Sequence, residues 1–229
     1  HNNVDYKATR GSVIETSSFY NSFALYGYVY DSGSSFTNST TVNSSINGIQ
    51  MSKNGSGSEY KASTVYWPGA SKKATFFAVA PYSAYSNVSA NNGGPTITYT
   101  VPQTVSNQED LLVAEATEVT CDGKSAPALT FNHALAAITF TKGDLGDFTS
   151  ISKVEISGVN NKGTLSSFET PLSWTNQTID GSTNTYSITS LNDIMFLMPQ
   201  TTPTGAKLKV TFKNETENKT YVADLNGTE

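Results

Sequence analysis

The chain has 229 residues, which is long for one β-sandwich and sufficient for two of about 100 residues each. Charged residues make up only 14%, and the net charge is −5 with the Lys and Arg residues scattered, which argues against nucleic acid and anionic membrane surfaces as partners. A single cysteine, Cys121, excludes an internal disulfide, and no apolar run approaches the ~18 residues that span a bilayer.

Strand patterns dominate the first half of the chain. Residues 23–30 are apolar on both faces, with three tyrosines on one of them, so we expect both faces to be covered. Residues 74–80 are also apolar on both faces and predict a central strand, which Pro81 ends because proline cannot donate to the ladder. Residues 96–101 alternate with threonines outward, and residues 110–114 predict a short buried strand.

Polar loops separate these predicted strands. Residues 31–45 form a tract of Ser, Thr, Asn and Gly, while Asn54-Gly55 and residues 91–95 have turn sequences. Residues 121–127 have the composition of a break between two strand-rich regions. The sequence therefore predicts a domain boundary near Lys124, with an N-terminal domain over residues 1–124 and a C-terminal domain over residues 125–229.

The second half also reads as β. Residues 134–140 and 192–198 predict strands, and Val154 and Ile156 alternate with polar neighbours. Residues 207–213 give the clearest pattern, with three apolar side chains inward and lysines and a threonine outward, an arrangement that discourages edge-to-edge aggregation. The predicted fold class is all-β, made of sandwich domains.

No pattern for catalysis or metal binding is present, so the sequence predicts no catalytic residue, no metal site and no cofactor, and the chain is not expected to be an enzyme. His133 is the one internal histidine, and we expect a structural or loop role for it, because both metal sites and acid–base catalysis need further convergent groups. Cys121 lies in a predicted linker without a nucleophile motif. Asp144 and Asp147 flank a glycine loop without the spacing of a calcium loop, and a turn explains them better.

Aromatic residues are the remaining candidates for ligand binding. Trp67, Trp174 and the tyrosines are the candidates for a sugar-stacking platform, with Trp67, Tyr82 and Tyr85 as the ligand-binding candidates among them. The alternative is that the aromatic side chains pack under loops or against the other domain, as we expect for the tyrosines of residues 23–30.

Several segments, in this order and spacing, resemble the fimbrillin, or Mfa-like, family of Bacteroidales surface pilins. Each is a weak signal alone, but together they span most of the chain. They are Ala8-Thr-Arg10, Trp67-Pro-Gly69, Thr75 to Pro81, Gln108 to Ala114, Phe131 to Phe140, Ile151 to Gly163 with Trp174, Phe196 to Gln200 and Ala206 to Val210.

The resemblance implies two tandem transthyretin-like β-sandwich domains of Greek-key type and a lipoprotein precursor carried to the outer membrane. In polymerising members, a protease cuts after an N-terminal arginine and removes the first strand. The groove then accepts a donor strand from another subunit. Arg10 fits this cleavage position and is the only arginine in the chain.

Family members usually continue beyond the segment matched by Tyr221 to Leu225. The resemblance therefore leaves three readings for the C-terminal strands: truncation, proteolysis, or a member without a donor segment. We expect a structural subunit (stalk, anchor or tip) of a surface fimbria that joins other subunits by strand exchange. The alternative is a monomeric surface adhesin for a host or bacterial glycan or protein. In either case, contact with the membrane is expected only through a lipid anchor.

Overall fold

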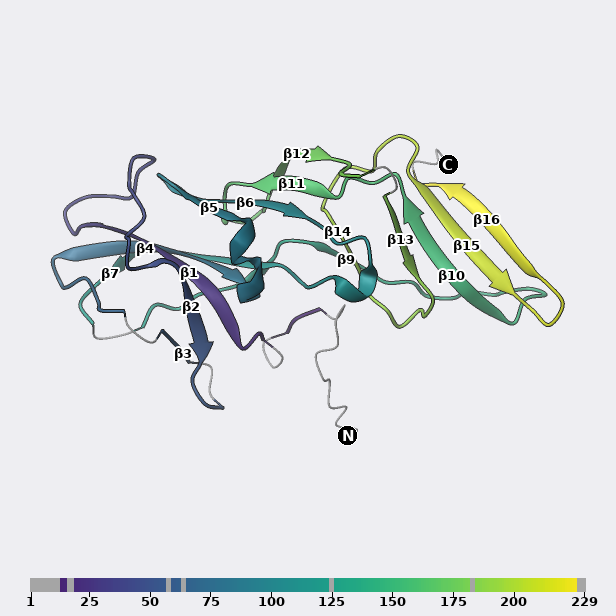
Figure 1. Ribbon diagram of the computed structural model, residues 1–229, viewed down its shortest axis with the longest axis horizontal. Helices are drawn as coiled ribbons and strands as arrows, with labels where there is room; N and C mark the ends of the chain where they lie inside the picture. The colour runs from purple at the N-terminus through teal and green to yellow at the C-terminus, as the bar shows by residue number, and fades with distance from the viewer. Residues whose placement is uncertain are drawn as a thin grey trace.

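The computed structural model describes residues 13–15, 19–56, 59–62, 65–123, 126–181 and 184–225. These residues are nearly all β, with antiparallel strands and two short 3₁₀ helices among them, which confirms the predicted all-β class. The strands are β1 (Ser22–Asp31), β2 (Asn47–Lys53), β3 (Tyr60–Lys61), β4 (Lys72–Ala80), β5 (Val88–Asn91), β6 (Gly94–Thr100), β7 (Leu112–Thr120), β8 (Asn132–His133), β9 (Ala136–Ile138), β10 (Ser150–Ser157), β11 (Lys162–Leu165), β12 (Trp174–Thr178), β13 (Thr185–Ile188), β14 (Met195–Leu197), β15 (Lys207–Lys213) and β16 (Asn218–Asp224), and the 3₁₀ helices are η2 (Tyr82–Asn87) and η3 (Val105–Asn107). The molecule is elongated, with β1–β4 near one end and β15–β16 at the other (Figure 1).

A six-stranded sheet with the order β3-β2-β1-β4-β7-β8 forms the N-terminal end. Its central strands β1 and β4 are buried on both faces, as their apolar sequences predict, because each face is covered by a separate hydrophobic cluster. Tyr28 and Phe77 point into one cluster, and Phe23 and Phe76 point into the other. Loop residue Phe36 packs edge-on against Tyr28, so the long polar loop contributes to the cover.

A second sheet combines strands from both halves of the chain. Its order is β12-β11-β6-β5, and β6 pairs with β11 from Lys162↔Thr100 to Leu165↔Ile97. Lys124, where the sequence predicts a domain boundary, lies outside the described residues, and the division into domains stays a prediction. The shared sheet nevertheless means that strands from either side of residue 124 are hydrogen-bonded to each other.

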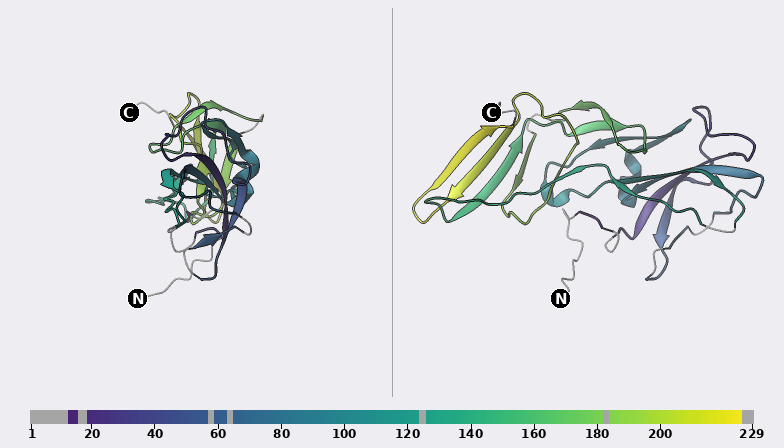
Figure 2. Two further views of the ribbon diagram at one scale, coloured as in Figure 1. Left: turned by 90° about the vertical axis from the view of Figure 1, so that its left-hand side faces the viewer. Right: turned by 180° about the vertical axis from the view of Figure 1, so that it is seen from behind.

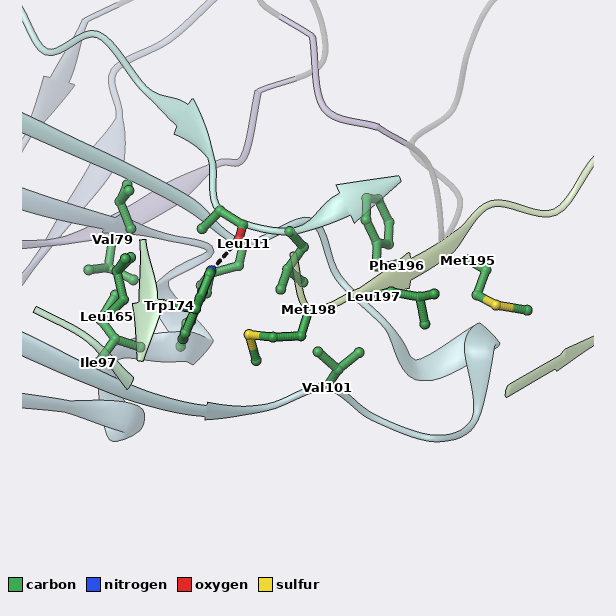
Figure 3. Packing of buried hydrophobic residues seen from close by; sticks show 14 of the residues in the cluster. Val79, Ile97, Val101, Leu111, Leu165, Trp174, Met195, Phe196, Leu197 and Met198 are labelled. Carbon is green, nitrogen blue, oxygen red and sulfur yellow. Dashed lines mark hydrogen bonds between the residues drawn. The ribbon is translucent and has the colours of Figure 1, made fainter. Parts of the chain in front are cut away.

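The larger hydrophobic cluster lies along this shared region. It includes Ile97 from β6, Leu165 from β11 and Met198 after β14, and all three are buried (Figure 3). Trp174 is also buried there, and its Nε1–H donates to the carbonyl oxygen of Ala134 at 2.7 Å. Buried indole groups usually find such a partner, and this bond connects β12 to the chain before β9.

The third sheet, β13-β10-β15-β16, lies at the C-terminal end, as the view from behind also shows (Figure 2). β9 and β14 form a separate two-stranded ladder between the two ends of the molecule. These two strands are shorter than the predicted segments 134–140 and 192–198. Asp193 is already committed to a turn, since its N–H donates to Ser190, and only Met195 to Leu197 reach the ladder.

β7 is longer than the short buried strand predicted over residues 110–114. It continues to Thr120 because its polar second half pairs with β4 beyond a bulge. The turn predictions are confirmed: Asn54 lies between β2 and β3, and residues 91–94 close the β5–β6 hairpin. Gly93 has a φ of +74° and faces the backbone of Asn38 so closely that a Cβ would lie 2.6 Å from Asn38 Cα.

Candidate functional site

The C-terminal sheet has one apolar face whose burial declines from one edge to the other. Tyr186 of β13 and Ile156 of β10 are buried against the larger cluster. Their neighbours on β15, such as Val210, are only half-buried, and Tyr221 on β16 is 47% exposed. The apolar face is therefore covered at β13 and open to solvent at β16, where the pairing Val210↔Tyr221 extends it.

β16 is the edge strand of this sheet, and its outer side is unpaired among the described residues. Its ladder with β15 has an unbroken register from Lys207↔Asp224 to Lys213↔Asn218. The N–H of Leu225 donates to Ala206, and opposed residues alternate between bonded and non-bonded pairs. Thr220 and Val222 consequently direct their backbone N–H and C=O groups away from β15, toward the open edge.

The opposite face of the same sheet is charged. Glu155 on β10 accepts from Lys153 at 2.8 Å and forms an ion pair with Lys209 at 3.3 Å. The hydrogen bond from Lys153, followed by that from Lys209, holds the pKa of the Glu155 carboxyl below its ordinary value. The sheet thus presents one charged face and one partly open apolar face.

This arrangement can bind an extended polypeptide strand. Unpaired N–H and C=O groups on an edge form a template for a further strand, and the apolar face provides surface for alternate side chains of that strand. Tyr221 and Val222 are neighbours on this edge strand, and their side chains lie on opposite faces of the sheet. Val222 is 60% exposed. Sequence reasoning predicted β15 clearly but missed the open edge, because Leu208, Val210 and Phe212 were expected to point into a closed core.

The N-terminal segment before β1 is held by a buried carboxylate. Asp110 Oδ2 accepts the backbone N–H of Ile14 at 2.9 Å, and the Tyr20 hydroxyl donates to the Asp110 carbonyl oxygen at 3.0 Å. Ile14 itself is buried in the smaller cluster. Ile14, Phe19 and Tyr20, which follow the predicted cleavage position, therefore help to cover one face of the six-stranded sheet.

His133 on β8 completes this arrangement. Its Nδ1 lies 2.8 Å from Asp110 Oδ2, which agrees with a structural role for the histidine. Burial is the main cause that raises the pKa of the Asp110 carboxyl, although the Ile14 and His133 bonds oppose the shift. Its other oxygen, Oδ1, is buried without a hydrogen-bond partner. The three partners are far apart in sequence, and nothing in the pattern of residues 110–114 pointed to them.

The aromatic candidates for ligand binding do not form one platform, and Trp174 is buried in the larger cluster. Trp67 stacks on Phe76 at 5.8 Å and packs against the smaller cluster, and its Nε1 is buried without a partner. Tyr82 and Tyr85 stack on each other at 5.0 Å on η2, beside the larger cluster. Phe76 and Phe77 of β4 point into opposite clusters, so Trp67 and Tyr82 belong to opposite faces of the sheet. Their role in ligand binding stays a prediction.

Arg10, the predicted processing position, lies outside the described residues. Cys121 is a buried free thiol whose pKa is raised by burial. Asp144 accepts from the Gly146 N–H in a turn, as predicted. Within the described residues no three His, Cys, Asp or Glu side chains gather as metal ligands, and no helix has the length and hydropathy to cross a membrane.

Comparison with known proteins gives two findings. A family model described as fimbrillin-like matches residues 16–229. A crystal structure from Bacteroides ovatus ATCC 8483, described as that of a candidate cell adhesion protein, is similar with a TM-score of 0.50 and 19% sequence identity, over 93% of this chain and 78% of the other. At that identity the likeness shows a common fold. No curated protein matches the chain.

Proposed function

This chain belongs to the fimbrillin-like family, and from that premise we propose that it is a structural subunit of a cell-surface fimbria, a stalk, anchor or tip component. In this proposal subunits are joined by donor-strand exchange after N-terminal processing at Arg10. The subunit is exported as a lipoprotein precursor and works at the outer membrane. Its partners are other subunits, and its role is mechanical, without catalysis.

The open edge of the C-terminal sheet is the observation that supports strand exchange. Thr220 and Val222 offer backbone groups to a neighbouring strand, and Tyr221 offers apolar surface on the same edge. A strand from another subunit would pair with these backbone groups and cover the apolar surface at the same time, as in other cases of β-strand addition. In this reading β16 is an acceptor edge, and the donated strand extends the sheet at the end of the elongated molecule (Figure 2).

Processing at Arg10 would act on the chain ahead of the described strands. The first of these is β1, which begins at Ser22, so cleavage after Arg10 would leave it in place. Ile14 and Tyr20 would also stay attached, because both are hydrogen-bonded to Asp110. The strand that the family resemblance expects to be removed is therefore none of the described strands.

The test is cleavage of the folded protein with an arginine-specific protease, followed by mass spectrometry and native gel electrophoresis. Because Arg10 is the only arginine, one cut is expected, and the processed form should assemble into a ladder of oligomers. The Arg10→Gln variant is the matched control and should stay uncut and unassembled. Resistance of the folded protein to the protease would contradict processing. A clean cut that gives only monomer would contradict a polymerising stalk and leave the tip and anchor roles.

The second candidate, a monomeric adhesin, has one observation in its favour. Tyr82 and Tyr85 form a stacked pair at the surface, and Tyr85 is 47% exposed. Exposed aromatic faces are common in sites that stack on ligands. An adhesin of this kind would stay monomeric after cleavage and would bind a surface glycan or protein.

A further inference from the structure

A cleft of about 260 Å³ lies beside η2, on the part of the molecule that strand exchange does not use. One wall is η2 with Ser83 and Asn87, and the other is the segment that carries Asn107 and Glu109. Tyr99 from β6 also lines the cleft. The cleft is somewhat smaller than the roughly 300–1,000 Å³ of pockets for drug-sized ligands, which suits one sugar ring.

The polar groups of this cleft come from both walls. Ser83 Oγ donates to Glu109 Oε2 at 3.1 Å, which connects the walls and orients the carboxylate. Asn87 and Asn107 bring amides, each with two N–H donors and a carbonyl acceptor. Burial raises the pKa of Tyr99 to about 12, so its hydroxyl is neutral at physiological pH. A carboxylate, two amides and a neutral hydroxyl together can accept from and donate to neighbouring ligand hydroxyls.

The charge of the cleft narrows the class of ligand. Glu109 is the one charged residue among the described residues that line it, and no lysine or arginine is there to bind phosphate, sulfate or a sugar acid. Anionic ligands are therefore disfavoured. The amides and the carboxylate likewise disfavour a lipid, because an apolar ligand would leave them desolvated without partners.

Two apolar surfaces complete the chemistry. Pro81 and Pro102 line the cleft with rigid C–H faces, and Tyr99 adds an aromatic ring. The stacked pair of Tyr82 and Tyr85 stands on the same short helix as Ser83 and Asn87. A pyranose has a ring of hydroxyls around its edge and apolar C–H groups on its faces, so it matches a mixed surface of this kind.

We propose that this cleft binds a single neutral sugar residue, such as a hexose at the end of a surface glycan. Glu109 accepts hydrogen bonds from two adjacent sugar hydroxyls, and Asn87 and Asn107 bond to further hydroxyls from either wall. Pro81 and Tyr99 contact the C–H face of the ring. Binding is weak for one ring and gains strength when many subunits are arrayed on a surface.

The test is saturation-transfer NMR with the full chain and the methyl glycosides of glucose, galactose, mannose and N-acetylglucosamine. At least one glycoside should receive saturation from the protein, with a Kd in the millimolar range found by titration. Glu109→Gln and Asn107→Ala should each raise the Kd for that glycoside at least ten-fold. Both side chains are exposed, and circular dichroism and a thermal melt verify that the variants fold.

A matched control lies in the neighbouring larger cleft of about 430 Å³, where Asp193 is the lining carboxylate. Asp193→Asn should leave sugar binding unchanged. The proposal is overturned if no glycoside receives saturation, or if Glu109→Gln and Asn107→Ala bind as wild type does. It is also overturned if the small cation methylammonium binds to the wild type but not to Glu109→Gln, while no glycoside binds. The cleft would then bind cations and not sugars. None of these outcomes depends on whether subunits assemble through β16.

Discussion

Asp110 is the residue where protonation and the N-terminal segment are most closely linked. Its side chain is fully buried, accepts from Ile14 and contacts His133 through the same oxygen, and leaves Oδ1 without a partner. Burial raises the pKa of this carboxyl, so the native state holds the proton more tightly than the unfolded chain does. By linkage, this contribution to stability is fully present below about pH 4, the unfolded pKa, and is lost as the pH rises through the native pKa.

Asp110→Asn should remove that loss, since an amide stays neutral and its oxygen can still accept from Ile14. We expect the free energy of unfolding of the variant, relative to wild type, to rise with pH above about pH 4 and then to level off. Urea unfolding of both proteins between pH 3.5 and pH 8 measures this difference. Asp110→Ala is the control: relative to Asp110→Asn it should cost about 1–3 kcal/mol at all pH values, because the Ile14 N–H loses its buried acceptor and neither variant titrates at this position. A difference between Asp110→Asn and wild type that does not change with pH would contradict the linkage.

At the scale of single residues, the sequence predicted which side chains are covered better than it predicted the contacts between them. It predicted that the tyrosines of residues 23–30 are covered and that His133 has a structural role. It could not predict the Asp110 arrangement, because Ile14 lies 96 positions away and His133 lies 23 positions away. The same holds for the separation of Trp67 from Tyr82, which depends on which face of the six-stranded sheet each aromatic side chain covers.

Among the elements, β16 is the strand through which we propose that subunits assemble, and the backbone hydrogen-bonding groups on its two edges can be tested separately. The N–H of Val222 points to the open edge, and the N–H of Tyr221 points to β15, given the alternation fixed by the Leu225–Ala206 bond. Val222→Pro should leave the free energy of unfolding within about 1 kcal/mol of wild type, because proline is tolerated where an edge N–H faces solvent. It should abolish the oligomer ladder that follows cleavage at Arg10.

Tyr221→Pro is the matched control, since it removes an N–H that bonds within the sheet. It should destabilise the protein more than Val222→Pro does, by about 1–3 kcal/mol, because the ladder with β15 loses a hydrogen bond. Urea unfolding and native mass spectrometry after cleavage measure both variants. Ladders formed by Val222→Pro would mean that the acceptor edge lies elsewhere in the subunit.

Strand prediction succeeded where the local pattern and the tertiary environment agree. Residues 74–80 and 207–213 have clean patterns, and both form strands close to the predicted bounds. Residues 134–140 and 192–198 were predicted longer than β9 and β14, because a hydrogen bond to Trp174 and a turn at Ser190 use backbone groups that a longer ladder would need. The half-open face of β15 could not be predicted, since alternation tells which side chains share a face but not what covers that face.

The whole molecule holds its two halves together through a shared sheet and a shared core. β6 pairs with β11, and one buried cluster contains residues from β1 and β4 as well as from β10 and β13. Two tandem sandwiches joined by a linker near residue 124 would each have a core of their own and could unfold separately. The continuous cluster instead favours one cooperative unit, in which loss of one end exposes the core of the other.

Calorimetry should therefore show one unfolding transition whose calorimetric and van't Hoff enthalpies agree. Phe76→Ala and Ile156→Ala probe the two ends, since the side chains are buried at the N-terminal and C-terminal sheets respectively. Each should cost about 2–5 kcal/mol, and both should lower the same transition. If each substitution shifts a different one of two transitions, the tandem-domain prediction is correct and the β6–β11 pairing is a contact between separately stable domains. A single transition lowered by both would mean that a fimbrial load applied at β16 is carried by the same cooperative unit that holds the N-terminal segment at Asp110.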